Sequence, residues 1–251
     1  MEVFNHLLDQ TMDYLWLFIL LALLAEIFGT IGGFGSSLFF VPIASYFLDF
    51  HSVLGITALF HVTSNLSKIL LFKKGIDKKI LIYLGTPAVI FVIIGAYLSK
   101  FIDPKKLELF LSAFLITISL IFLLGKKINL QPTIKNAISG GIISGFSAGF
   151  FGTGGAIRGV VLTAFRLKKE VFIATSALID LMIDLSRSIV YIHNGYVYKS
   201  NIYLIPILLV VSIIGTLIGK VILKKISEER FRGIVLILIL ITGLITFFKQ
   251  L

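Results

Sequence analysis

The sequence predicts an all-α membrane protein built from two inverted repeats of five segments each, and three observations support this. The chain of 251 residues is 57% hydrophobic and only 14% charged. Such a composition is too apolar for a soluble domain, which needs polar surface to cover its core. Its apolar runs are long enough to cross a bilayer. Finally, two glycine-rich stretches are near copies of each other, and the polar residues that follow them match at a constant offset.

The two copies are aligned through their glycines and through the polar residues downstream. The first motif, Phe28–Gly33, reads FGTIGG, and the second, Phe151–Gly155, reads FGTGG. Further along, positions match at an offset of 119 residues: His61 with Asp180, Asn65 with Asp184, Ser67 with Ser186, and Lys68 with Arg187. Duplication with broken helices and polar groups is typical of transporters, whose site lies where the repeats meet.

Ten membrane segments follow from the apolar runs when each glycine cluster is taken as a break. The 11-residue arm 156–166 spans about 16 Å, which is too short for a hydrocarbon core of about 30 Å. We therefore expect re-entrant hairpins or broken helices, and eight to ten segments in all, with full crossing of the arms left open. The expected segments are 14–30, 34–48, 52–72, 80–99, 105–124, 135–151, 156–166, 170–192, 201–222 and 231–248.

The basic residues favour ten segments over eight. In the ten-segment arrangement, 15 of the 20 Lys and Arg residues outside the spans face one side, whereas eight helices divide them 9 to 11. Basic loops stay cytoplasmic, so both termini are expected outside. An odd number of segments per repeat inverts the second repeat. We expect a first repeat at 1–125, a basic cytoplasmic linker at 126–134 and a second repeat at 135–251.

The glycines at both breaks predict an anion site. Glycine permits positive φ and close approach of the backbone, and a helix that begins after such a turn presents free N–H groups and partial positive charge. Arg158 adds a cation that can bind an oxyanion through two hydrogen bonds. Alternatively, the glycines only permit close packing, and Arg158 forms a fixed internal ion pair with Asp180, Asp184 or Glu26. The expected substrate-binding residues are Gly29, Thr30, Gly32, Gly33, Gly35, Ser36, Gly152, Thr153, Gly154, Gly155 and Arg158.

A polar line on the helices after the motifs suggests ion coupling or gating. Asp180 and Asp184 share a helix face, and Arg187 follows Asp184 at i,i+3. Because no cation lies at helical spacing from Asp180, it is the stronger candidate for carrying protons, while Asp184 and Arg187 are interpreted as a structural clamp. Glu26 keeps an open role. The expected coupling or gating residues are His61, Asn65, Asp180, Asp184 and Arg187.

The motif GTIGGFG at Gly29–Gly35, followed by Val41-Pro42, resembles the glycine-rich signature of the sulfite exporter TauE/SafE family, also called the toluene sulfonate uptake permease family. The second motif resembles its repeat, and the resemblance covers nearly the whole chain. It implies transport of small sulfur-containing anions such as sulfite, sulfonates or related organosulfur compounds. Two departures, Phe34 within the glycines and Leu162-Thr163 without a proline, leave sulfite itself unassigned.

We therefore expect a secondary transporter for a small sulfur-containing anion, working by alternating access in a bacterial or archaeal plasma membrane. The alternative is a proton- or cation-coupled carrier centred on Asp180, Asp184 and His61. An intramembrane enzyme is disfavoured, since no protease motif surrounds the serines or aspartates. No catalytic residue, metal site or cofactor is expected. The expected partners are the anion, the bilayer and protons but no nucleic acid, and a homodimer is left open.

Overall fold

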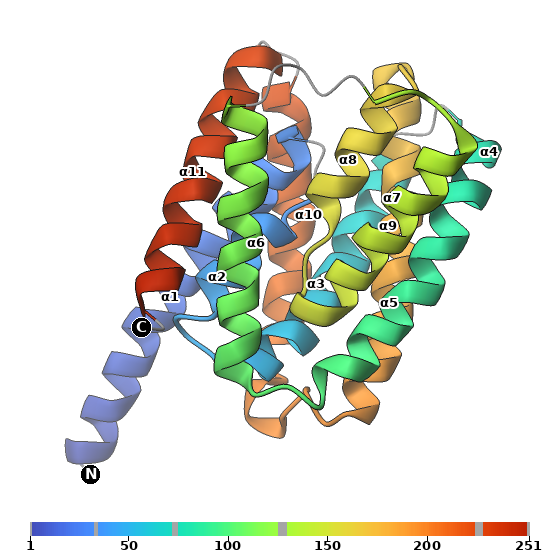
Figure 1. The fold of residues 1–251 in the computed structure, drawn as a ribbon. Helices are drawn as coiled ribbons and strands as arrows, with labels where there is room; N and C mark the ends of the chain where they lie inside the picture. The colour runs from blue at the N-terminus through green and yellow to red at the C-terminus, as the bar shows by residue number, and fades with distance from the viewer. Residues whose placement is uncertain (1, 33–34, 72–74, 125–129, 224–227, 250–251) are drawn as a thin grey trace.

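The computed structural model describes residues 2–32, 35–71, 75–124, 130–223 and 228–249, and these residues form helices and short connections (Figure 1). Gly33 and the linker residues 126–129 lie outside the described residues. The helices in chain order are α1 (Glu2–Gly32), α2 (Ser37–Ala44), α3 (Phe50–Leu71), α4 (Lys78–Ile80), the π-turn η1 (Leu81–Gly85), α5 (Thr86–Ser99), α6 (Pro104–Leu124), α7 (Ile134–Phe151), α8 (Gly155–Ala164), α9 (Lys169–His193), the 3₁₀ turn η2 (Lys199–Asn201), α10 (Leu204–Leu223) and α11 (Glu228–Lys249).

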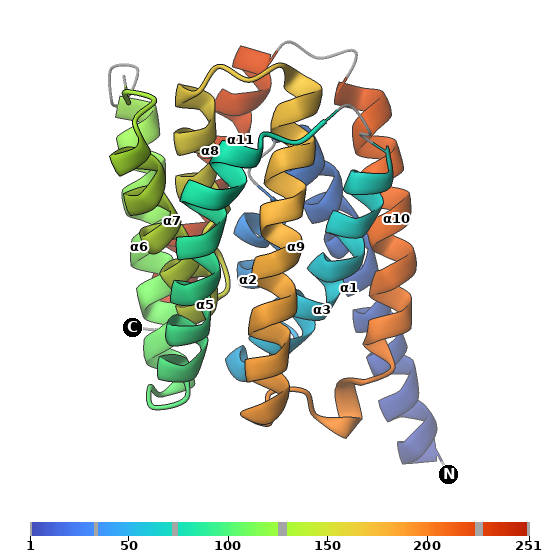
Figure 2. The same ribbon diagram turned by 90° about the vertical axis from the view of Figure 1, so that its right-hand side faces the viewer.

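The all-helical membrane fold is as predicted. Within the described residues, five helices are long and apolar enough to cross a membrane: Tyr14–Gly32, Phe50–Leu71, Lys78–Ser99, Pro104–Leu124 and Leu204–Leu223. Both labelled chain ends lie at the same end of the bundle, and the connection from α8 to α9 lies at the opposite end (Figures 1 and 2). The expectation that both termini lie outside stays a prediction.

Two helices reach only part of the way through the bundle. Helix α2 has 8 residues and α8 has 10, which is about 12 and 15 Å at 1.5 Å per residue. Each begins after a glycine with positive φ, Gly35 at 84° and Gly152 at 90°. Helix α8 begins part-way along the bundle and runs away from the termini, while α2 runs towards them (Figures 1 and 2). The expected breaks are present, although α1 continues to Gly32 before its break.

Glycines allow close contact between helices α5 and α7. A Cβ atom at Gly145 or Gly149 would overlap a carbonyl oxygen of α5, and one at Gly141 would overlap the carbonyl of Leu84 in the preceding turn η1, so only glycine permits this approach. Small residues at four-residue spacing are the usual device for close packing of membrane helices. On the other side of the molecule, Gly215 and Gly219 of α10 similarly meet α1. Helices α3 and α9 pack against each other between these two pairs.

Candidate functional site

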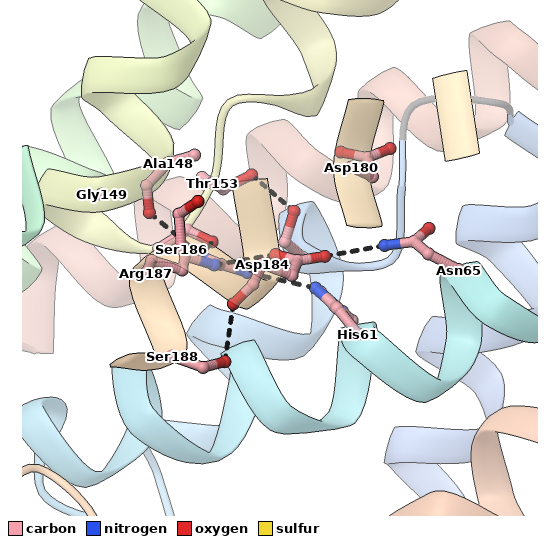
Figure 3. Close-up of polar contacts among 12 residues, drawn as sticks. His61, Asn65, Ala148, Gly149, Thr153, Asp180, Asp184, Ser186, Arg187 and Ser188 are labelled. Carbon is pink, nitrogen blue, oxygen red and sulfur yellow. Dashed lines mark hydrogen bonds and ion pairs between the residues drawn. The ribbon is translucent and has the colours of Figure 1, made fainter. Parts of the chain in front are cut away.

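Helices α3 and α9 meet through a hydrogen bond at the centre of the site. Asn65 on α3 donates from Nδ2 to Oδ2 of Asp184 on α9 at 2.7 Å (Figure 3). Both residues are buried. They are also partners at the 119-residue offset found in the sequence. The contact joins a helix of the first half of the sequence to a helix of the second half.

The two glycine breaks also touch each other. The hydroxyls of Ser37, at the start of α2, and Thr153, just before α8, are 3.0 Å apart. Helix N-termini carry free N–H groups and partial positive charge, and here two of them converge. Glycine is needed locally as well, because a Cβ at Gly29 would overlap the backbone of Ser36 and one at Gly154 would overlap the carbonyl of Ser144.

A small polar cavity lies beside the converging N-termini. Its volume is about 20 Å³, which is room for about one water molecule and too little for a sulfur oxyanion. A neighbouring cavity of about the same volume shares Gly35, Lys68 and Asp180 with it. The first cavity is lined by Gly35, Ser36, Ser37, His61, Ser64, Asn65, Lys68, Ala148, Gly152, Gly154, Gly155, Arg158, Asp180, Ile183, Asp184 and Arg187.

Arg158 on α8 forms a two-pronged ion pair with Asp180 on α9. Its Nη1 is 2.6 Å from Oδ1, and its Nη2 donates to Oδ2 at 2.6 Å. Its Nε donates to Ser176 at 3.3 Å. The Arg158 side chain is 2% exposed and that of Asp180 is 16% exposed. Sequence spacing pointed to no cation for Asp180, because its partner comes from another helix.

The first half of the chain holds a neutral counterpart of this pair. Ser36 stands three residues after Gly33, as Arg158 stands three residues after Gly155, and His61 matches Asp180 at the 119-residue offset. The hydroxyl of Ser36 lies 2.9 Å from Nε2 of His61. The aligned positions are therefore in contact in both halves, as an uncharged pair in the first half and as an ion pair in the second.

Glu26 on α1, whose role the sequence left open, is the centre of a buried polar cluster. The residue is 0% exposed, and Nζ of Lys68 lies 2.9 Å from its Oε1. A buried carboxylate is tolerated only when a counter-charge and hydrogen bonds compensate it. Four hydroxyls also donate to it, from Thr30, Ser36, Ser64 and Thr216. Because these donors lie on α1, α3, α10 and at the first break, Glu26 connects elements from both halves of the chain.

Arg187 on α9 stabilises the end of α7. It donates from Nε to Asp184 at 2.8 Å and from Nη1 to the carbonyl oxygens of Ala148 and Gly152 at 3.0 and 2.8 Å. The last carbonyls of a helix have no partner within the helix, and in a membrane they must find one in the protein. Tyr191 satisfies another, donating to Gly149 at 2.7 Å (Figure 3 shows the surroundings). These contacts match the structural clamp expected for Asp184 and Arg187.

Opposite charges balance within the site. Three buried cations each face a carboxylate: Lys68 with Glu26, Arg158 with Asp180, and Arg187 with Asp184. The alternative of an internal ion pair for Arg158 therefore describes its contacts in this structure. An anion that enters the cavity finds the partial charges of two helix N-termini, and it reaches a full positive charge only by competing with one of the three carboxylates.

Most of the predicted site residues lie around the cavity, on both sides of the α3–α9 contact. Gly29 and Thr30 line the neighbouring cavity, whereas Thr153 and Gly32 are not among the lining residues described. Gly33 lies outside the described residues. Of the four hydroxyl donors to Glu26, the sequence interpretation included Thr30 and Ser36 as expected substrate-binding residues and missed Ser64 and Thr216. Ser64 could have been found, since it precedes Lys68 by one helical turn and accepts a hydrogen bond from it at 2.7 Å, but nothing in the sequence indicates Thr216.

Comparison with known proteins identifies the family. The family model described as "Sulfite exporter TauE/SafE" matches residues 18–246. The chain belongs to this family. A similar protein is a probable membrane transporter protein of Methanocaldococcus jannaschii, 27% identical over 241 residues that cover 86% of this chain and 89% of the relative. No solved structure matches the chain. Together with the apolar helices, these findings identify a transmembrane transporter of the TauE/SafE family, as the glycine motifs predicted.

Proposed function

We propose that this TauE/SafE protein is a secondary transporter that carries a small sulfur-containing oxyanion, such as sulfite or a sulfonate, across the plasma membrane. The observation that carries the proposal is the place of Arg158, whose guanidinium lines a cavity at the converging N-termini of α2 and α8. A guanidinium binds oxyanions through two parallel hydrogen bonds. Helix N-termini add N–H donors without bringing a counter-ion.

Alternating access between two inverted repeats, 1–125 and 135–251 joined by a basic linker at 126–134, is the mechanism we propose. Three matched contacts support it. Asn65 touches its counterpart Asp184, and the Ser36–His61 contact matches the Arg158–Asp180 pair. Lys68 and Arg187 each contact the helix before the break of their own half, at Glu26 of α1 and Ala148 of α7. Matched helices also pair crosswise, α5 with α7 and α10 with α1.

The sidedness follows from the basic residues. We propose that the end of the bundle opposite the termini is cytoplasmic, since the basic helix α4 and the basic connection from α8 to α9 lie at that end (Figure 1) and basic loops are retained inside. The alternative carrier centred on Asp180, Asp184 and His61, in which Arg158 is merely structural, is less well supported, because Arg158 lines the cavity together with these residues. The name of the relative and the family both point to transport rather than to enzymatic activity.

A ligand panel on the detergent-purified protein tests the proposed function. Melting temperatures are measured with sulfite, sulfate, thiosulfate, taurine, sulfoacetate and chloride. A sulfur oxyanion present at 100 times its Kd stabilises the wild type by about 2.7 kcal/mol. The double variant Arg158→Gln/Asp180→Asn keeps the net charge and removes the guanidinium. This double variant is expected to fold, and its melting temperature is expected not to rise when the anion is added.

The matched control removes an ion pair elsewhere in the molecule. Glu108 of α6 and Lys249 of α11 pair at 3.3 Å, away from the cavity. The variant Glu108→Gln/Lys249→Met also keeps the net charge and is expected to respond to the anion as the wild type does. An unchanged shift in the Arg158 double variant would remove Arg158 from the site. Absence of a shift with every anion in the wild type would refute the proposed function.

A further inference from the structure

We propose that the carboxylate of Asp180 occupies the substrate's binding position on the guanidinium of Arg158. An incoming anion replaces this carboxylate, and Asp180 takes up one proton as it is displaced. The inference rests on the proposed function. It adds that the coupling ion is a proton and that Asp180 carries this proton. It follows from the geometry of one ion pair, the charge balance of the site and the volume of the cavity.

In the structure, each nitrogen of the Arg158 guanidinium already has a partner. Both terminal nitrogens of Arg158 are 2.6 Å from an oxygen of Asp180, and Nε is directed to Ser176. A carboxylate and a sulfonate present their oxygens to a guanidinium in a similar two-pronged way. With only about 20 Å³ in the cavity, an oxyanion cannot be added beside the pair. It gains both space and hydrogen bonds by displacing the Asp180 carboxylate.

The charge balance explains why a proton accompanies the anion. The three cations of the site are matched by three carboxylates, so an added anion leaves one negative charge uncompensated in a buried place. An uncompensated buried charge is strongly unfavourable. Arginine does not release its proton in proteins, and the charge of Lys68 is already balanced by Glu26 at 2.9 Å. Protonation of the displaced carboxylate restores the balance.

Asp180 is the carboxylate best placed to take this proton. Glu26 and Asp184 are nearly inaccessible, with side chains 0% and 4% exposed, whereas the Asp180 side chain is 16% exposed. Asp184 also keeps a second donor, Asn65. The charged and titratable groups around Asp180 are Arg158 on α8, Lys68 and His61 on α3, Asp184 and Arg187 on α9, and Glu26 on α1, which holds Lys68.

The step is balanced without any covalent chemistry. Two N–H···O hydrogen bonds from Arg158 to Asp180 break and two to the anion form. One proton from water on the side open to the cavity binds an oxygen of Asp180, and release of the anion reverses both events. One proton thus moves with each anion, so affinity falls by about tenfold for each pH unit in the range where free Asp180 is ionised.

Calorimetry of the wild type measures this proton directly. Sulfate, methanesulfonate and sulfoacetate are titrated into the purified protein at pH 7 and pH 8, since none of these anions titrates in that range. In buffers of different ionisation enthalpy, the dependence of the observed heat on that enthalpy gives the protons taken up per anion. We expect a value approaching one for the wild type and about tenfold weaker binding at pH 8. The control Glu108→Gln is expected to behave identically.

The variant Asp180→Asn provides the second test. It has no carboxylate to protonate and leaves Arg158 unpaired, so it is expected to take up no proton, to bind equally at both pH values, and to bind more tightly than the wild type at pH 8. Anion binding to the wild type without proton uptake would overturn the exchange and leave the proposed transporter standing. Absence of binding by every anion would refute the transporter proposal and the exchange with it.

Discussion

The two halves of the site have the same layout and different chemistry. In the second half, Arg158 binds Asp180 with full charges on both sides, while the matched places in the first half hold Ser36 and His61, 2.9 Å apart. Arginine residues are likewise found only in the second half of the sequence, where Arg187 binds backbone carbonyls. The matched Lys68 binds the carboxylate of Glu26. The comparison teaches that the layout is shared by both halves, whereas the group suited to an oxyanion is present in the second half alone.

The largest expected loss of stability comes from removing one partner of the Arg158–Asp180 ion pair. Arg158→Gln leaves Asp180 buried without its counter-charge, which costs about 3–5 kcal/mol of stability. Adding Asp180→Asn is expected to recover most of that loss. Ser36→Ala removes the neutral counterpart and is expected to cost about 1–3 kcal/mol. Unfolding in mixed micelles with increasing denaturing detergent measures all three. Equal losses for Arg158→Gln and Ser36→Ala would show that the halves are energetically alike.

The next comparison replaces the matched cations Arg187 and Lys68. Arg187→Met leaves Asp184 and two helix-end carbonyls short of donors, and about 3–5 kcal/mol is expected to be lost. Lys68→Met also leaves a buried carboxylate without its counter-charge, but Glu26 keeps four hydroxyl donors, so a loss at the lower end of the same range, about 3 kcal/mol, is expected. The same unfolding assay compares them. A larger loss for Lys68→Met would mean that the hydroxyls do not hold Glu26 without the ammonium.

A smaller effect is expected from the glycines that let the halves approach each other. A methyl group at Gly95 meets the backbone of Phe146 and Phe150, whereas one at Gly215 meets the side-chain stem of Glu26. The methyl group at Gly95 overlaps the carbonyl oxygen of Phe146, and the one at Gly215 comes within 2.8 Å of the fixed stem of Glu26, so both are expected to cost about 1–3 kcal/mol, with the larger loss for Gly95→Ala. Melting temperatures rank the two. The reverse order would show that Glu26 is more rigid than the α5–α7 contact.

The smallest effect is expected at the junction of the two breaks. The hydroxyls of Ser37 and Thr153 are 3.0 Å apart, and removing either is expected to cost about 0.5–1.5 kcal/mol. In a double-mutant cycle, the second alanine should add little to the first, since the shared hydrogen bond is already lost. Strictly additive losses would mean that the two hydroxyls are stabilised by other groups and that the breaks are not coupled through them.

Local features were predictable from the sequence, whereas long-range partners were narrowed only for Arg158, to three carboxylates that include its partner Asp180. Apolar runs and basic loops predicted the helices, and the glycines predicted breaks between residues 30 and 34 and between 151 and 156, because hydrophobicity and backbone freedom act over a few residues. In the structure α1 continues to Gly32 and the left-handed glycine of the first break is Gly35. The partners of Glu26 come from positions as distant as Thr216, 190 residues away. The partner of Asp180 lies 22 residues away on another helix. Such pairs depend on how helices are placed in space, so helical spacing alone left Asp180 without a cation.

Alternating access is the claim on which the account depends, and the chain allows a direct test because it contains no cysteine. Ile183 lines the cavity at the place that matches Ser64. The variant Ile183→Cys, reconstituted in liposomes, is treated with a membrane-impermeant thiol reagent from one side and then from the other. The account predicts labelling from both sides and protection by the transported anion. Labelling from one side only, with or without the anion, would contradict it.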